Sequence, residues 1–141
     1  MFPKSRVQKE TGELMSTEGN KEFIRRYLDA ISGKPKTPAI VDLFVVEQPL
    51  KDHIAASEAA LPLYRIDAEE IIAEGDLVSV RGRARGTNNG PFMGMPPTGK
   101  EVDFAIFITY KVAGGKIVDH WMLTDNLTFM QQLGAIPAPQ G

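Results

Sequence analysis

The chain has 141 residues, of which 43% are hydrophobic and 24% charged, and its formal net charge is −2. This length fits one domain with a core and an internal pocket, and the composition is that of a globular protein. The near-neutral charge gives no reason to expect nucleic acid or an anionic membrane as a partner, and no apolar run approaches the ~20 residues of a membrane span. The chain has no cysteine and only two histidines, so we expect neither a disulfide framework nor a metal site.

The N-terminal residues have basic side chains but lack the apolar centre of a secretory signal, which predicts a cytoplasmic protein. We expect residues 1–15 to form a flexible extension, residues 16–135 the domain, and residues 136–141 a tail. Ser16 or Thr17 can cap a first helix that ends at Gly33. The buried stripe of this helix is predicted at three- and four-residue steps: Phe23, Ile24, Tyr27, Leu28 and Ile31.

Two further helices are predicted before residue 65. Thr37 and Pro38 are typical of a cap and first helical residue, and predict a short helix through Phe44. A third helix is predicted to start near Pro49, to contain His53, and to end near Pro62. The first half of the chain is therefore predicted to be mostly helical.

The second half changes to the period of strands. A turn at residues 74–76 precedes a predicted strand over residues 77–87, on which Gly82 and Ala84 share the inner face. These small residues leave space that fits either a ligand cavity or a sharply coiled strand. The opposite face has three arginines at residues 81, 83 and 85, which we interpret as a solvated outer face or subunit contact in preference to an anion site.

A loop rich in glycine and proline spans residues 87–100, and the apolar side chain of Phe92 could cover the mouth of a pocket. The next predicted strand spans residues 102–112 and alternates, with Phe104 on its apolar face. A turn at residues 113–115 predicts a hairpin with the strand that contains Trp121.

Asp125 follows this last strand and precedes a predicted helix over residues 126–133. If the strand persists, Trp121, Leu123 and Asp125 point the same way, and an apolar wall beside a carboxylate raises its pKa. Asp125 is then a candidate general base. The alternative is that Asp125 only caps the helix, and the two roles can coexist.

Helices followed by antiparallel strands predict an α+β fold with one curved sheet packed on helices. At this level the chain resembles the SnoaL-like polyketide cyclase (ester cyclase) family, within the nuclear-transport-factor-2-like (cystatin-like) superfamily. The resemblance covers roughly residues 17–135. It depends on the order and spacing of several motifs, namely AEGDLVSVR at 73–81, GTNNGPFMG at 86–94, PPTGK at 96–100, GKIVDHW at 115–121, Asp125, and QQLG at 131–134.

The resemblance implies a cone-shaped barrel that encloses a pocket, a homodimer, and intramolecular aldol cyclisation or isomerisation without a metal or cofactor. It implies Asp125 as general acid/base, removing a proton from a carbonyl-activated carbon of a small apolar molecule. Many relatives have histidine where this chain has Asn88, which can donate a hydrogen bond but cannot exchange protons.

His53 matches a histidine of relatives and is a second catalytic candidate, the alternative being an ordinary core or surface histidine. His120 is expected on the face opposite Trp121. The predicted substrate-binding residues are Trp121, Tyr64, Asn88, Phe92 and Phe104, and the aromatic ones could equally be core. Two other functions stay open: a dehydratase or epoxide hydrolase on the same fold, and a non-catalytic protein that binds a hydrophobic ligand.

Overall fold

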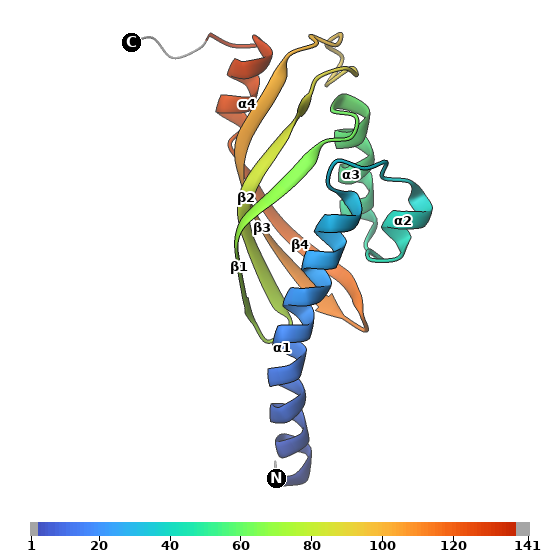
Figure 1. The fold of residues 1–141 in the computed structure, drawn as a ribbon, viewed down its shortest axis with the longest axis vertical. Coiled ribbons are helices and arrows are strands. Elements are labelled where there is room, and N and C mark those ends of the chain that lie inside the picture. Colours follow the sequence, from blue (N-terminus) through green and yellow to red (C-terminus); the bar gives the residue numbers. More distant parts are fainter. Residues whose placement is uncertain (1–2, 138–141) are drawn as a thin grey trace.

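The computed structural model describes the backbone of residues 3–137 and the side chains of residues 17–137. Three helices come first: α1 (Pro3–Ile31), α2 (Pro38–Asp42) and α3 (Gln48–Ala60). Four strands follow, β1 (Arg65–Glu74), β2 (Leu77–Thr87), β3 (Glu101–Ala113) and β4 (Lys116–Thr124), and the last element is α4 (Asn126–Leu133). The predicted α+β class is confirmed, and helices α1 to α3 lie together on one side of the sheet (Figure 1).

The helix boundaries agree with the predicted ones except at the start of α1. This helix begins at Pro3, so Ser16 and Thr17 lie inside it and do not cap it. Thr37 does cap α2, because its side chain accepts a hydrogen bond from Ile40 N at 3.3 Å. The proposed flexible extension, domain limits and tail stay predictions. No described helix is long and apolar enough to cross a membrane.

The four strands form one antiparallel sheet in the order β1-β2-β3-β4. The predicted curved antiparallel sheet is confirmed, and among the described residues it is not closed into a barrel (Figure 1). Alternate residues of β2 and β3 are buried against the helices, as predicted. The inner-face residues of these two strands are Val78, Val80, Ala84, Val102, Phe104, Ile106, Ile108, Tyr110 and Val112.

A β-bulge in β4 decides which of its side chains face the helices. Val112 pairs with Ile117 while Lys111 pairs with Asp119, so Val118 is an extra residue on β4. Before the bulge the odd-numbered Ile117 is fully buried. After the bulge the even-numbered residues, from His120 onward, lie on the inner face opposite Tyr110 and its neighbours. The bulge therefore reverses the parity of the strand.

Gly82 and Ala84 serve different purposes on β2. A Cβ atom at Gly82 would lie 2.4 Å from Asp67 O, so glycine is required where β1 has its irregular register between Ala68 and Glu70. Ala84 lines the internal cavity. Ala84 thus agrees with the cavity interpretation, whereas Gly82 is required by the close approach of β1.

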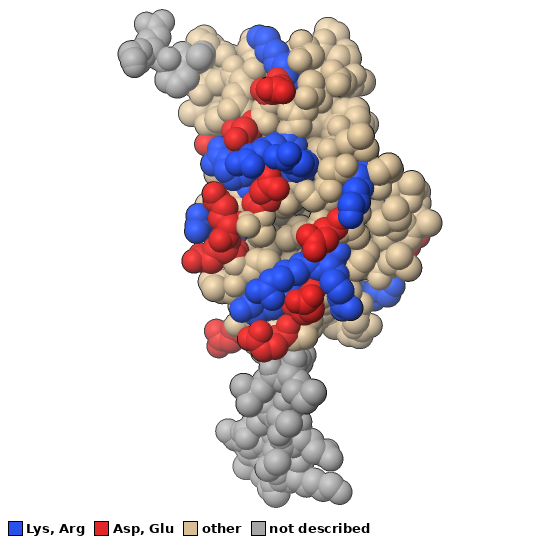
Figure 2. Space-filling model, viewed as in Figure 1, with Lys and Arg blue, Asp and Glu red and all other residues tan. Residues whose placement is uncertain are grey.

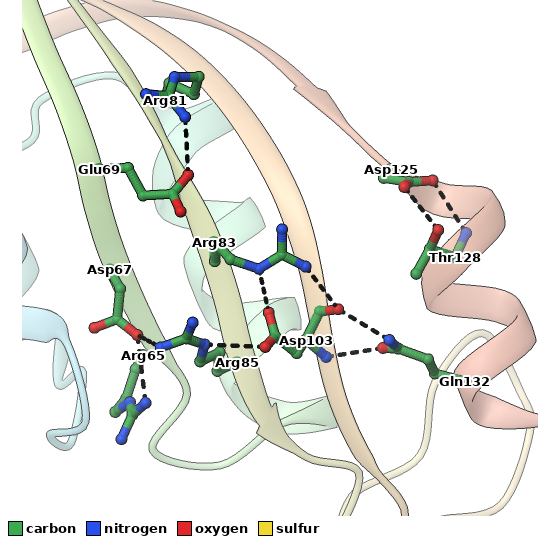
Figure 3. Close-up of polar contacts among 10 residues, drawn as sticks. All are labelled: Arg65, Asp67, Glu69, Arg81, Arg83, Arg85, Asp103, Asp125, Thr128 and Gln132. Atoms are coloured by element: carbon green, nitrogen blue, oxygen red, sulfur yellow. Dashed lines mark hydrogen bonds and ion pairs between the residues drawn. The ribbon is translucent and has the colours of Figure 1, made fainter.

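The outer face of the sheet has basic and acidic side chains close together (Figure 2). Arg83 and Arg85 both pair with Asp103, and Arg85 also reaches Asp67 at 2.9 Å (Figure 3). Arg81 pairs with Glu69 at 3.1 Å. Because each arginine has a carboxylate partner, the structure agrees with a solvated or contact surface and not with an anion site.

Candidate active site

An internal cavity of about 470 Å³ lies between the helices and the inner face of the sheet. Its wall is mostly apolar, and its polar side chains come from α1, α3, β3, β4, α4 and the segment before β1. The lining residues are Tyr27, Ile31, Leu50, His53, Ile54, Ser57, Ala60, Leu61, Tyr64, Ile66, Ala84, Phe92, Phe104, Ile106, Ile108, Tyr110, His120, Met122, Leu123, Thr124, Asn126 and Phe129. This combination is typical of a site for a small apolar ligand with few polar groups.

Three phenylalanines form one part of this wall. The ring of Phe129 on α4 lies 5.1 Å from that of Phe92 and 4.8 Å from that of Phe104, measured between centroids. Phe92 comes from the loop after β2 and Phe104 from β3. The two predicted residues, together with Tyr64, therefore line one cavity. Their contact with a substrate stays a prediction.

The polar part of the wall contains a histidine–carboxylate pair. His120 Nδ1 is hydrogen-bonded to Glu47 Oε1, and the two side chains are only 15% and 10% exposed. His120 lines the cavity, whereas Glu47 lies behind it. A carboxylate that accepts the Nδ1–H of a neutral imidazole leaves the lone pair on Nε2, so His120 is held in the tautomer that can act as a base.

Two local features bring Glu47 and His120 together. The segment before α3 forms a parallel bridge with β4 at Val45 and Ile117, closed by hydrogen bonds from Val46 N to Ile117 O at 3.0 Å and from Ile117 N to Phe44 O at 2.7 Å. The bulge at Val118 then turns His120 inward. Glu47 is the N-cap residue of α3 but makes no side-chain capping bond, which leaves its carboxylate free for the imidazole.

His53 lies on the same cavity, on the first turns of α3. Its Nε2 is 3.4 Å from Ser57 Oγ, one helical turn further on. Partial desolvation, followed by the charge that His120 can carry, lowers the pKa of His53. The structure thus brings the predicted His53 together with His120, whose face the sequence analysis did not assign to the cavity. It also adds Glu47 and Ser57, which the sequence analysis missed.

Asp125 does not occupy the predicted position. It is exposed and does not line the cavity, and its two oxygens accept hydrogen bonds from Thr128 Oγ1 at 2.7 Å and Thr128 N at 3.1 Å (Figure 3). These bonds hold the pKa of Asp125 below its usual range, the reverse of the expected upward shift. Asp125 is the N-cap of α4, which was the alternative interpretation.

Trp121 is also on the outer face. It is 54% exposed and does not line the cavity. Leu123, which is 77% exposed and alternates onto the same face, still borders the cavity. The expectation that His120 points away from Trp121 is correct, because the two pair with Tyr110 and Thr109 on opposite faces of β3. The expected strand direction of Asp125 stays a prediction, since β4 ends at Thr124. The assignment of the cavity to the Trp121 face is wrong, because the bulge at Val118 reverses the parity of β4.

Asn88 is 1% exposed and does not line the cavity. Its amide Nδ2 donates to Ala60 O at 3.0 Å and Gly90 O at 2.9 Å, and its Oδ1 accepts from Thr98 N at 2.9 Å and Thr98 Oγ1 at 2.8 Å. The bond to Ala60 O ties the loop after β2 to the end of α3, and the other three hold the loop to itself at Gly90 and Thr98. The expected substrate contact is corrected to a structural clamp, since no polar capacity of this amide is left for a ligand.

The residues of this site that the sequence analysis missed are separated along the chain. Glu47 and His120 are 73 positions apart, and no local pattern connects them. Among the described residues, no three histidine, aspartate or glutamate side chains are grouped so as to hold a metal ion. The polar groups on this cavity are two histidines, one of them paired with a carboxylate, several hydroxyl groups and Asn126.

Several proteins of known structure have a similar fold. Similar structures include AclR, a proposed hydroxylase of Streptomyces galilaeus, at 21% identity and a TM-score of 0.75 over 88% of this chain and 86% of that one. A proposed SnoaL-like polyketide cyclase of Jannaschia sp. CCS1 is 25% identical at a TM-score of 0.72 over 86% and 95% of the two chains. IdmH of Streptomyces antibioticus, a proposed polyketide cyclase, is 24% identical at a TM-score of 0.67 over 82% and 98%.

No protein with a curated description matches the sequence. The family model of SnoaL-like polyketide cyclases matches residues 47–133, which begin at Glu47 and include both histidines of the cavity. That match covers more than half of the chain. This protein therefore belongs to the SnoaL-like polyketide cyclase family.

Proposed function

We propose that this protein is an acid/base enzyme of the cyclase or isomerase type, acting on a carbonyl-activated carbon of a small apolar molecule. The observation that carries the proposal is the His120–Glu47 pair on the wall of an apolar cavity. A base that is oriented by a carboxylate and shielded from bulk water is what proton abstraction beside a carbonyl group requires. His120 takes the role that the family resemblance had implied for Asp125.

The reaction starts when His120 Nε2 removes the proton from the activated carbon. The electron pair of the broken C–H bond moves to the carbonyl group and forms an enolate, while Glu47 stabilises the imidazolium. In a cyclisation the enolate carbon attacks a second carbonyl of the same molecule, and the resulting alkoxide takes the proton back from His120. In an isomerisation the proton returns to a different carbon. The cavity contributes by holding the reacting groups close together.

His53 is a second proton carrier in this scheme. Its lowered pKa keeps the imidazole neutral near pH 7, so that Nε2 or Nδ1 can donate or accept according to its tautomer. It lies on α3, on the same cavity as His120 of β4. Two histidines on different elements allow one to remove a proton and the other to deliver one.

The proposal can be tested with 2-tetralone, an apolar bicyclic ketone with an activated C–H group. Exchange of its C1 protons in D₂O, followed by NMR, measures proton abstraction without knowledge of the natural substrate. We expect the wild type to accelerate exchange over buffer, and His120→Gln to lose about 10²–10⁴-fold of that acceleration. Glu47→Gln should also slow exchange, because it removes the charge that stabilises the imidazolium.

Asp125→Asn is the matched control, since asparagine also caps helices well and the side chain lies outside the cavity. Exchange by this variant should stay within about twofold of the wild type, an effect at the level of ordinary surface substitutions. Loss of exchange in Asp125→Asn with retention in His120→Gln would refute the proposal. Binding of 2-tetralone without exchange in any form of the protein would favour the non-catalytic ligand-binding alternative.

We also propose that two copies of the chain associate through the outer face of the sheet. Phe107, Trp121 and Leu123 are 55%, 54% and 77% exposed on neighbouring strands. Together they expose an apolar area on the order of 400 Å², a size at which a patch often has a function. Arg81 and Arg83 flank the patch together with their carboxylate partners. A second copy related by a two-fold axis could therefore place its acidic groups against these basic groups, and the reverse.

A further inference from the structure

All three tyrosines of the chain lie on the cavity, each from a different part of the fold. Tyr27 belongs to α1, Tyr64 to the segment between α3 and β1, and Tyr110 to β3. They are only 1%, 5% and 2% exposed. A buried tyrosine hydroxyl usually finds a hydrogen-bond partner, so three of them around one apolar cavity need an explanation.

Two of the three tyrosines, Tyr27 and Tyr110, are partners of each other. The rings of Tyr27 and Tyr110 meet edge to face with centroids 5.7 Å apart. Burial is the first cause that raises the pKa of both side chains, and the side-chain hydrogen bond between them has a smaller effect. Such a bond uses the proton of only one hydroxyl, so the proton of the other is left for another acceptor.

Every side-chain oxygen and nitrogen of residues 17–137 that is closed off from solvent has a hydrogen-bond partner. Within the same residues the Tyr64 hydroxyl makes no hydrogen bond to another protein group, and the Tyr27–Tyr110 pair leaves one hydroxyl proton over. The hydroxyl groups of Tyr64 and of this pair therefore border the cavity space. Tyr110 pairs directly with His120 across β3 and β4, which brings their Cβ atoms to about 5 Å on the inner face. Tyr110 thus lies next to the proposed base on the sheet, and Tyr64 lines the same cavity.

We propose that Tyr64 and Tyr110 bind the carbonyl oxygen of the substrate with two hydrogen bonds, and that Tyr27 positions Tyr110. The ligand class is a ketone or related carbonyl compound with its oxygen toward these hydroxyls. This inference rests on the proposed function, because it assigns the oxygen partner of the carbon that His120 deprotonates. When the C–H bond breaks, the electron pair ends on this oxygen as an enolate, and two donors stabilise the developing charge.

Burial is the main cause that raises the pKa of both Tyr64 and Tyr110. The two phenols consequently keep their protons throughout the neutral range and can donate at every pH where a histidine base works. The wall around them is apolar, so competing acceptors are scarce and a carbonyl oxygen gains more from each bond than it would in water.

The test compares binding of 2-tetralone with binding of tetralin, which has the same rings without the oxygen. Equilibrium dialysis at about pH 8, above the usual histidine pKa, keeps imidazolium donors out of the comparison. We expect Tyr64→Phe and Tyr110→Phe each to weaken 2-tetralone binding about three- to tenfold, the value of one net hydrogen bond, and to leave tetralin binding within about twofold.

Phe104→Leu is the matched control, because it alters the wall without an oxygen contact and should weaken both ligands alike. Unchanged binding of 2-tetralone to both tyrosine variants, or equal losses of both ligands, would overturn the inference. Binding of tetralin shows whether each variant is folded. If Tyr110→Phe does not fold, the change in 2-tetralone binding of Tyr64→Phe alone tests the inference. His120→Gln should still bind 2-tetralone more tightly than tetralin but should lose proton exchange. The exchange assay therefore tests His120 as the base, and the binding comparison tests the two tyrosines independently of it.

Discussion

Replacement of Asn88 by alanine tests whether this residue is a structural clamp. The variant loses two hydrogen bonds donated by Nδ2 and two accepted by Oδ1, all at 2.8–3.0 Å in a site that is 1% exposed. A net hydrogen bond contributes about 1 kcal/mol, and a stranded buried partner costs about 1–3 kcal/mol. Four bonds therefore set an upper range of several kcal/mol for the loss of stability.

The loss of stability is smaller than this upper range, because some former partners of Asn88 keep another hydrogen bond. Ala60 O still accepts a bond from Gly90 N at 3.2 Å, and Thr98 Oγ1 already accepts from Lys100 N at 3.2 Å. The stranded groups are then chiefly Gly90 O and Thr98 N. We expect Asn88→Ala to lower the free energy of unfolding by about 3 kcal/mol.

Urea unfolding followed by circular dichroism measures this change, at two protein concentrations so that any contribution of a dimer is recognised. The adjacent Asn89 is the matched control, because it is exposed and no side-chain hydrogen bond of it occurs within the described part of the chain. Asn89→Ala should change stability by no more than about 0.5 kcal/mol. Equal stabilities of the two variants would refute the clamp and reopen a ligand contact for Asn88.

Two further results are expected. The pKa of His53 is lowered in the folded state, whereas the unfolded chain takes up this proton near the usual pKa of about 6.5. The wild type should therefore lose stability relative to His53→Gln as the pH falls below that value. Tm measured against pH checks this, and a Tm difference between the two proteins that does not change with pH would contradict it. Leu123→Lys should convert a dimer to a monomer in sedimentation analysis. Leu43, the C-cap of α2, is 63% exposed away from the proposed interface, so Leu43→Lys should leave the dimer intact. A wild type that is already monomeric would refute the interface.

Much of the fold could be predicted because it depends on local patterns. Alternation over residues 102–112 gave the correct inner face of β3, and the Thr37–Pro38 pair gave the start of α2. Asp125 and Gly134 bound α4 as cap and left-handed terminator, as their residue types indicate. These features depend on steric and hydrogen-bonding preferences within a few residues.

The site could not be predicted in the same way, because it depends on non-local geometry. One extra residue, Val118, reverses the parity of β4, so that the face of His120, and not that of Trp121, lines the cavity. The sequence has no glycine at this position to indicate a bulge. The partner of His120 comes from the parallel bridge before α3, which pairs segments about 70 residues apart. Apolar periodicity identifies faces but does not indicate such pairings.

The cap at Asp125 still bears on the cavity, through the helix that it starts. Asp125 fixes the first turn of α4 through Thr128, and Phe129, the next residue, packs on Phe92 and Phe104 at the aromatic part of the wall. A change that frays this turn would shift that wall and could reduce turnover without any chemical role for the carboxylate. Loss of activity on removal of the cap is therefore not evidence for a base, and only a substitution that keeps the cap separates the two roles.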